Sequence, residues 1–251
     1  MKDIVSCKLS NGIGKQLFQI GAVIYYSKKY NKYPIFQNTI NSLVTDKVDV
    51  LSDDIFQTIK FKNHFERVER SFNDLPEYNE NVMLQGSFQA FQYITKEVFI
   101  EIQHMIYNNE DYMYKAYEEY NKIKNHFKTE NDDDLISIHV RARNNTIDDT
   151  YYNKAFNIKD IDKLYPVVFS PNIDLCKKQL GFIKNAYFVD TGNTCVDFIL
   201  MSFFKNNIID NSFFGWWAAF ISNYDEKIVI TPSIWEHSGV DDLYPPGWII
   251  V

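Results

Sequence analysis

The spacing of apolar residues changes from strand-like to helix-like within the first thirty positions. The run DIVSCKL at 3–9 predicts a β-strand, and the turn SNGIG follows it. Leu17, Ile20 and Ile24 then recur at helical spacing, which predicts a helix over 15–30. A strand, a glycine turn and a helix in this order indicate an α/β unit.

The rest of the first half carries weaker signals. Residues 34–37 (PIFQ) and 82–84 (VML) predict short strands, and the apolar spacing over 94–127 predicts helix. The stretch from 41 to 80 is mixed and charged, and its pattern does not define any element.

The second half alternates regularly between strand and helix patterns. The polar, acidic segment TENDDD at 129–134 marks a boundary, so we expect an N-terminal α/β half over 1–130 and a C-terminal α/β half over 131–251. The β-branched run LISIHV at 135–140 predicts a buried parallel strand. Further strands are predicted at 166–170, 186–190, 206–210 and 227–231, with helices at 151–158, 173–182, 195–205 and 212–222. This alternation predicts a parallel, doubly wound sheet.

Composition narrows the class of protein. Of the 251 residues, 45% are hydrophobic, which suffices for a large core, and the net charge of −7 argues against nucleic acid as a partner. Cys7, Cys176 and Cys195 are odd in number and form no C-x-x-C pair, so neither a disulfide scaffold nor a cysteine zinc site is expected.

No segment has the length of a membrane span. The longest apolar run, 213–221, is much shorter than the roughly 20 residues that cross a bilayer. The start MKDIVSCKL lacks the apolar core of a signal peptide. We therefore expect a soluble, cytoplasmic protein without an integral membrane segment; peripheral contact with a membrane stays open.

Gly12 and Gly14 stand in the turn N-G-I-G-K-Q between the first strand and the first helix. Glycines there let backbone amides approach a ligand, and the start of a helix favours an anion. A dinucleotide fingerprint would need a third glycine where Leu17 stands, and the G-K-[ST] of a phosphate loop is missing. The turn is either part of an anion site or a tight turn without a ligand.

Two strand ends carry residues suited to an anion. His139, Arg141 and Arg143 stand at the end of a buried strand, where ligands of open α/β sheets bind. An arginine there can hold two phosphate oxygens at once. Asn211 and Ser212 follow a later strand and can cap the apolar helix behind them, whose free amides favour phosphate. The structural alternatives are an ion pair for the arginine and a plain helix cap.

Two weaker signals do not support a metal site. The acidic run 132–134 contains a D-x-D pair, but it precedes a strand, away from the ligand-binding end, so a solvated linker is the better interpretation. His64, His104, His126 and His237 show no ligand spacing. We therefore expect no bound metal.

Five segments share the pattern of one family. L-S-N-G-I-G-K-Q-L-F-Q at 9–19 is similar to G-G-L-G-N-Q-L-F-Q, M-L-Q-G-S-F-Q at 83–89 to L-Q-G-Y-F-Q, and I-H-V-R-A-R-N at 138–144 to H-V-R-R-G-D. V-F-S-P-N-I-D-L-C-K at 168–177 is similar to F-S-D-D-I-x-W-C-K. The longest segment, 198–220, is similar to L-M-S-x-C-K-H-N-I-I-A-N-S-x-F-S-W-W-A-A-Y. Together they resemble glycosyltransferase family 11, the α-1,2-fucosyltransferases.

The resemblance implies a GT-B-like fold, two Rossmann-like α/β halves with a cleft between them. It implies an inverting, metal-independent transfer of fucose from GDP-fucose to a terminal sugar of a glycan or glycolipid, with galactose and an α-1,2 linkage expected. The C-terminal half would bind the donor and the N-terminal half the acceptor, with the tail packing back on the N-terminal half. Catalytic roles would fall to Arg141 and His139. Donor binding would involve Gly12, Gly14, Gln16, Arg143, Asn144, Ser170, Asn172, Asp190, Asn211, Ser212 and Phe213.

Three positions depart from the family's motifs. Ala142 stands in place of the second arginine, Asn144 in place of the aspartate, and Pro171-Asn172 in place of the carboxylate pair. An asparagine offers a donor as well as an acceptor, so the recognition of guanine that a carboxylate would provide is weakened at position 172. The alternatives are a transferase with a different nucleotide sugar and a non-catalytic protein that binds a nucleotide sugar or glycan.

Overall fold

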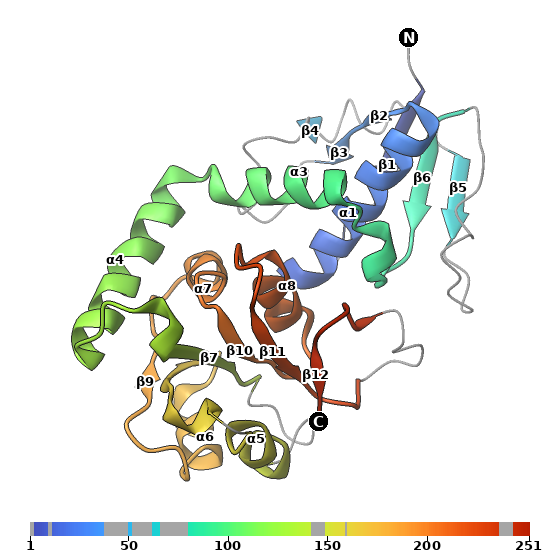
Figure 1. Ribbon diagram of the computed structural model, residues 1–251. Helices are drawn as coiled ribbons and strands as arrows, with labels where there is room; N and C mark the ends of the chain where they lie inside the picture. Colours follow the sequence, from blue (N-terminus) through green and yellow to red (C-terminus); the bar gives the residue numbers. More distant parts are fainter. Residues whose placement is uncertain are drawn as a thin grey trace. The chain divides into compact units, whose positions relative to one another are not determined.

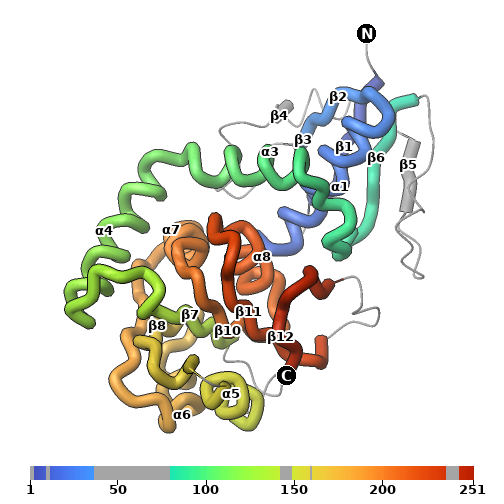
Figure 2. Tube along the Cα trace, viewed as in Figure 1, coloured from blue at the N-terminus to red at the C-terminus, as the bar shows by residue number. Residues whose placement is uncertain are grey.

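The computed structural model describes residues 3–9, 12–37, 50–51, 62–65, 80–141, 149–158, 160–235 and 243–251 (Figure 1). The chain divides into two compact units. The first unit comprises Met1–Asn109 with Asp241–Tyr244, and the second comprises Glu110–Val240 with Pro245–Val251. Figure 2 traces the chain through both.

A parallel sheet and two helices make up most of the described part of the first unit. The sheet runs in the order β2 (Tyr33–Pro34), β1 (Ile4–Cys7), β6 (Val82–Gln85) and β5 (Lys62–Phe65). β3 (Phe36–Gln37) and β4 (Val50–Leu51) form a separate parallel pair. The helices are α1 (Ile13–Tyr30) and α3 (Lys96–Tyr107), with the 3-10 turn η1 (Phe91–Tyr93) before α3.

Helix α1 begins and ends where its sequence allows. It starts directly after Gly12, whose carbonyl accepts hydrogen bonds from the N–H groups of Lys15 and Gln16. It ends at Asn31, which adopts the left-handed conformation that closes many helices. In its middle, a Cβ at Gly21 would lie 2.5 Å from Cδ1 of Ile94. A larger residue at this position would therefore require the Ile94 side chain to shift.

The second unit is built on a six-stranded parallel sheet with the order β12, β11, β10, β7, β8, β9. These strands are β7 (Leu135–His139), β8 (Tyr165–Phe169), β9 (Tyr187–Phe188), β10 (Asn206–Ile208), β11 (Ile228–Thr231) and β12 (Ile249–Ile250). The helices are α4 (Glu110–Phe127), α5 (Asp149–Phe156), α6 (Ile173–Gln179), α7 (Thr194–Met201) and α8 (Phe213–Ile221). Two 3-10 turns, η2 (Asp132–Asp134) and η3 (Ile161–Lys163), precede β7 and β8.

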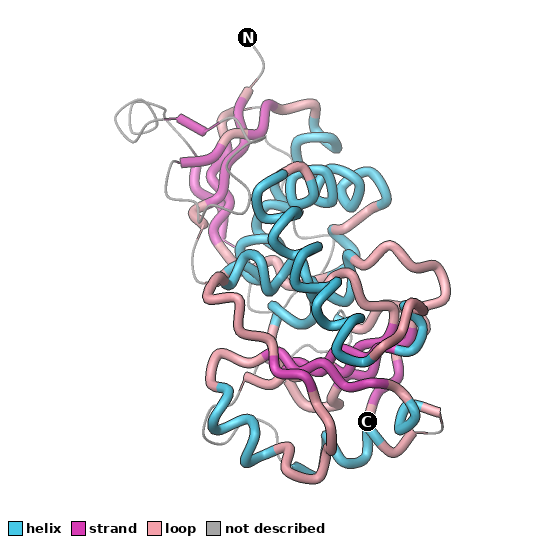
Figure 3. The backbone as a smooth tube through the Cα atoms, turned by 90° about the vertical axis from the view of Figure 1, so that its left-hand side faces the viewer, coloured by secondary structure: helices cyan, strands magenta, loops and turns pink. Residues whose placement is uncertain are grey.

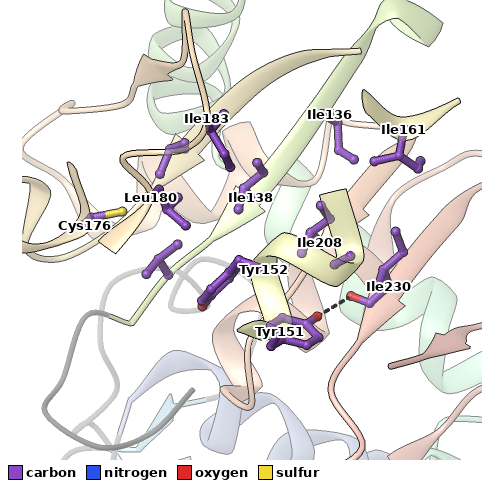
Figure 4. Close-up of a cluster of buried hydrophobic side chains, with 13 residues drawn as sticks. Ile136, Ile138, Tyr151, Tyr152, Ile161, Cys176, Leu180, Ile183, Ile208 and Ile230 are labelled. Atoms are coloured by element: carbon purple, nitrogen blue, oxygen red, sulfur yellow. Dashed lines mark hydrogen bonds between the residues drawn. The ribbon is translucent and has the colours of Figure 1, made fainter. Parts of the chain in front are cut away.

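Helices cover both faces of this sheet. α5 and α6 lie on one face, and α4, α7 and α8 lie on the other (Figures 1 and 3). Ile136 and Ile138 of β7 point toward α5 and α6, where they pack with Ile208 and Ile230 of the neighbouring strands (Figure 4). Because side chains alternate along a strand, Ser137 and His139 face the α8 side.

The strand and helix alternation predicted for the second half is confirmed, and two details differ. The predicted helix over 94–127 is two helices, α3 and α4, separated at residues 108–109. The division between the units falls between Asn109 and Glu110 rather than in the acidic segment, because α4 packs against α7. The tail's last strand, β12, extends the second unit's sheet beside β11.

Candidate functional site

The two central strands of the second unit's sheet, β7 and β10, are parallel neighbours. From β7 the sheet continues through β8 to β9 on one side, and from β10 through β11 to β12 on the other. Connections that leave two such strands in opposite directions open a crevice at the carboxyl ends of the strands. The residues that follow β7 and β10 therefore border the position where open α/β sheets bind ligands.

His139 and Asp210 join the two strands at this point. Nδ1 of His139 lies 2.9 Å from Oδ1 of Asp210, and both side chains are buried. Oδ2 accepts a hydrogen bond of 2.7 Å from the backbone N–H of Arg141, and Oδ1 accepts one of 3.0 Å from the N–H of Ser212. One carboxylate thus fixes the end of β7 relative to the segment that leads into α8.

The environment of Asp210 keeps its carboxyl group ionised. Burial by itself would raise the pKa of this group because it penalises the charged form. The nearby His139 and the hydrogen bonds from His139, Ser212 and the Arg141 backbone outweigh burial, so the pKa of Asp210 lies below its ordinary value. The carboxylate is a permanent acceptor at neutral pH.

Helix α8 begins directly against His139. Ser212 is its N-cap, with Oγ accepting a hydrogen bond of 3.4 Å from the N–H of Gly215. The ring of Phe214 stacks on the imidazole of His139, with centroids 5.0 Å apart and planes inclined by 23°. A Cβ at Gly215 would lie 3.2 Å from Nδ1 of His139, so glycine permits this approach. The positive end of the α8 dipole consequently lies at the crevice.

Two tyrosines of α5 hold the same strand ends from the opposite face of the sheet. The hydroxyl of Tyr152 donates a hydrogen bond of 3.2 Å to the carbonyl of His139. The hydroxyl of Tyr151 shares its one proton between the carbonyl of Ile209, at 2.6 Å, and that of Ile230, at 3.2 Å. Figure 4 shows the bond to Ile230. Burial raises the pKa of Tyr152 well above its ordinary value, so its hydroxyl remains a donor. The edge of the site is therefore held from both faces.

The structure brings five of the predicted residues to the carboxyl ends of β7 and β10: His139, Arg141, Asn211, Ser212 and Phe213. Asn211 is 5% exposed, and among the described residues its Oδ1 has no hydrogen-bond partner. Phe213 stacks on Trp235, with ring centroids 5.5 Å apart. The predicted residues Arg143 and Asn144 lie outside the described part of the chain.

Ser170, Asn172 and Asp190 lie at the same edge, behind β8 and β9. Asn172 caps α6, since its Oδ1 accepts a hydrogen bond of 3.1 Å from the N–H of Leu175. Ser170 accepts from the N–H of Asn172 at 3.2 Å. Asp190 is exposed. The side-chain oxygen of Asn172 is thus engaged within the protein, at a position where the family motif has a carboxylate.

Gly12, Gly14 and Gln16 belong to the first unit. Gly12 is the exposed N-cap of α1, and no atom lies within 4 Å of a Cβ built there. Gly14 and Gln16 are buried in the first turn of the helix. The glycine turn therefore leaves open space at the start of α1, and its expected part in donor binding stays a prediction.

Sequence reasoning included Asp210 and Gly215 in the candidate segment 210–217 without giving either a role, and it did not identify Tyr152. The signal for the first two was present, because the family's motif has alanine at 210 and serine at 215. Asp210 adds a carboxylate directly after a strand, and Gly215 removes a side chain five residues later. Together the two differences indicate that the side-chain contacts at this strand end differ from those of the family motif. Tyr152 carried no signal of its own in the sequence.

The acidic run 132–134 has structural contacts at the opposite end of the sheet. Oδ1 of Asp132 accepts hydrogen bonds from Tyr120 at 3.0 Å and from Lys124 at 3.2 Å. Over the described ranges, no cluster of three histidine, cysteine or carboxylate side chains has a metal-binding arrangement. Nor, in the same part of the chain, is any helix long and apolar enough to cross a membrane.

Comparison with known proteins gives a family match over nearly the whole chain. The sequence model of glycosyl transferase family 11 matches residues 2–251. The O-antigen biosynthesis glycosyltransferase WbnK of Escherichia coli is 34% identical over 90 residues, which are 34% of this chain and 30% of that protein. The alpha-1,2-colitosyltransferase of Escherichia coli is 36% identical over 106 residues, 39% of this chain and 35% of that protein. The alignments thus span about a third of each relative's length.

The fold has solved counterparts. The crystal structure of the α-1,6-fucosyltransferase NodZ of Bradyrhizobium, co-crystallised with GDP, is similar with a TM-score of 0.55 at 13% identity. The likeness covers 88% of this chain and 92% of that one. It confirms the predicted GT-B-like α/β fold with parallel sheets.

Proposed function

This chain belongs to glycosyl transferase family 11, and from that membership we propose that it transfers fucose from GDP-fucose to a terminal sugar of a glycan. The proposed acceptor is galactose, the proposed linkage α-1,2, and the reaction needs no metal. Two observations support a GDP sugar: the structurally similar fucosyltransferase NodZ was crystallised with GDP, and the sequence carries fucosyltransferase-like motifs. We place the reaction in the cytoplasm, in keeping with three buried cysteine thiols.

One observation carries the proposal: Arg141 and the amino end of α8 meet at the carboxyl ends of β7 and β10. A guanidinium and free helix amides are the groups that stabilise a phosphate. A diphosphate that leaves the sugar develops negative charge on its oxygens, and fixed donors aimed at that charge lower the barrier. This edge of the sheet thus combines the groups that would hold a nucleoside diphosphate.

The proposed reaction is a single displacement. The acceptor hydroxyl attacks the anomeric carbon of fucose from the side opposite GDP. The new carbon–oxygen bond forms as the bond to the β-phosphate breaks, the hydroxyl proton is released, and the anomeric configuration inverts. Arg141 and the α8 amides would stabilise the negative charge that develops on GDP, and His139 would line the same pocket. Arg143, Asn144, Ser170, Asn172, Asp190, Asn211, Ser212 and Phe213 would contact the donor, with Gly12, Gly14 and Gln16 forming the facing loop.

A second donor sugar is the alternative. One relative is described as an alpha-1,2-colitosyltransferase, and its identity to this chain is slightly higher than that of the other. In this chain Asn172 is engaged as the cap of α6, where the family motif would supply a carboxylate. The alternative is therefore a transferase for a GDP-linked sugar other than fucose, with the same diphosphate site.

Calorimetry with the purified chain tests which nucleotide it binds. GDP, GDP-fucose, GDP-mannose and UDP-galactose are titrated with and without a chelator. We expect binding of GDP and GDP-fucose that the chelator does not change. Loss of one charged hydrogen-bond donor costs about 1.5–3 kcal/mol, so Arg141→Ala should weaken GDP binding about 10- to 150-fold.

Lys154→Ala is the matched control, because it removes one exposed positive charge from α5 of the same unit. It should leave GDP affinity unchanged. Binding of GDP-mannose in preference to GDP-fucose would favour the alternative donor. Failure of all four compounds to bind would overturn the assignment of this edge of the sheet to a nucleotide sugar.

A further inference from the structure

We infer that Asp210 is a positioning residue of the donor site: its carboxylate fixes the proton of His139 on Nδ1 and holds His139, Arg141 and the start of α8 in one rigid frame. The inference rests on the proposed function for its catalytic consequence, but not for its geometry. Asp210 contacts His139, the Arg141 backbone and the Ser212 backbone, and is itself buried, 1% exposed.

The hydrogen-bond requirement at this position can be satisfied only by a carboxylate. Three donors converge on it: the His139 ring at 2.9 Å and the Ser212 N–H at 3.0 Å on Oδ1, and the Arg141 N–H at 2.7 Å on Oδ2. The two backbone N–H groups cannot change their role. An asparagine would present one oxygen and one NH2 group, so at least one backbone N–H would face another donor.

The same geometry selects the tautomer of His139. Because Oδ1 is an acceptor, the neutral ring must carry its proton on Nδ1. Nε2 then has a free lone pair, and among the described residues it has no hydrogen-bond partner. Phe214 covers one face of the ring, which opposes rotation. Asp210 and α8 thus fix the ring with the lone pair of Nε2 unengaged by the described residues.

Arg141 is fixed through its main chain. Its N–H is bound to Oδ2 of Asp210, so the guanidinium extends from a backbone position tied to β10. In the family motif quoted above, alanine stands at 210 and serine at 215. In this chain the carboxylate of Asp210 supplies the partner of His139, and Gly215 leaves the room that the ring needs. The pairing is therefore a feature of this chain's own residues.

Nitrogen NMR of the imidazole ring tests the geometry in a protein that keeps both His139 and Asp210. His64, His104, His126 and His237 are replaced by glutamine so that His139 gives the single ring signal. At a pH at which the ring is neutral, we expect a protonated Nδ1 and an unprotonated Nε2. A protonated Nε2 would overturn the inference without any reference to activity.

Asp210→Asn tests the consequence, with Asp132→Asn as its matched control. Asp132 is a carboxylate at the opposite end of the sheet that accepts hydrogen bonds from Tyr120 and Lys124, so the same substitution there affects stability and leaves the His139 ring alone. Measured below the melting temperatures of both variants, Asp210→Asn should change the tautomer and lower kcat about 10- to 100-fold, the usual effect of removing the partner that orients a functional histidine. Asp132→Asn should keep both the tautomer and kcat.

The outcomes separate the two proposals. A wild-type protein with the expected tautomer but no turnover with any GDP sugar would refute the proposed function and leave the geometry standing. An active wild-type protein whose Asp210→Asn variant keeps the same tautomer and the same kcat would overturn the inference. If Asp210→Asn does not fold, the wild-type tautomer still decides.

Discussion

Ser137 and Asn207 form a polar pair inside the apolar sheet of the second unit, with the Ser137 hydroxyl donating a hydrogen bond of 2.6 Å to Oδ1 of Asn207. The two residues are directly paired across β7 and β10, and both are fully buried. Nδ2 of Asn207 donates to the carbonyl of Phe204 at 3.1 Å. The pair favours the register of the same two strands whose ends carry His139 and Asp210, because a shift by one residue would break the buried hydrogen bond between the two side chains.

A double-mutant cycle measures this pair. Ser137→Ala leaves a buried oxygen of Asn207 without its donor, which should cost about 1–3 kcal/mol of unfolding free energy. In the double variant with Asn207→Leu, both polar partners are gone. We therefore expect it to be more stable than the sum of the single losses by roughly 1 kcal/mol or more, measured by urea unfolding. Additivity within about 0.5 kcal/mol would show that the two side chains act independently.

The close approach of α8 to His139 predicts an effect of Gly215→Ala. The new methyl group would lie 3.2 Å from Nδ1 of His139 and 3.3 Å from Cβ of Ile209. Overpacking of this kind costs about 1–3 kcal/mol, and it should also weaken GDP binding because the ring must move. Gly181→Ala is the control, since its nearest neighbour would be a carbonyl oxygen at 3.5 Å, and its stability should change by less than about 1 kcal/mol.

Much of the second unit could be predicted from the sequence because its strands are short β-branched runs separated by polar turns. LISIHV at 135–140 and KIVIT at 227–231 have the continuous apolar pattern of buried parallel strands, and the structure has strands there. β12 was not predicted, because two isoleucines between a tryptophan and the end of the chain carry no periodicity. The break between α3 and α4 was missed because apolar spacing continues across residues 108–109.

The sequence predicts which residues stand at the ends of individual strands, but not which of these residues contact one another. His139, Arg141, Asn211 and Ser212 each follow or end a predicted strand, so their common edge follows from parallel topology. That Asp210 pairs with His139 depends on β7 and β10 being neighbours, although 71 residues separate the two side chains. Strand order is a tertiary property that local periodicity does not encode, and so the central carboxylate received no role.

Lys227 predicts a pH dependence of stability on the alkaline side. Its ammonium group donates hydrogen bonds to the carbonyls of Phe220, at 2.6 Å, and Ser222, at 3.1 Å, at the end of α8. Burial lowers its pKa from 10.5 to about 8. Between these values the unfolded chain binds more protons than the folded chain, so this group makes stability rise with pH from about 8 to 10.5.

The measurement compares wild type with Lys227→Met by urea unfolding at several pH values in that window. Subtraction removes the titration of all other groups. The unfolding free energy of wild type should rise relative to the variant by up to about 1.4 kcal/mol for each pH unit. A constant difference across the window would mean that the two carbonyls and the helix end keep the lysine at its ordinary pKa.

Substitution of Asn211 distinguishes a side chain that contacts the ligand from one that only supports the fold. It is buried at the start of α8, yet its Oδ1 has no partner among the residues that the structure describes. A buried acceptor of this kind costs free energy in the unliganded protein, and a hydroxyl or N–H group of the nucleotide would satisfy it. Asn211→Ala should therefore change the melting temperature little and weaken GDP binding about 5- to 100-fold.

Asn206→Ala provides the matched comparison at the amino end of β10, whereas Asn211 follows the carboxyl end of that strand. Nδ2 of Asn206 donates to the carbonyls of Asp133 and Leu135 at the opposite end of β10. The same chemical change there should lower stability and leave GDP affinity intact. The reverse pattern, a stability loss at Asn211 without any loss of GDP affinity, would assign that oxygen to the protein's own packing. Opposite responses at the two ends of one strand would place the nucleotide at its carboxyl end without any need for a bound structure.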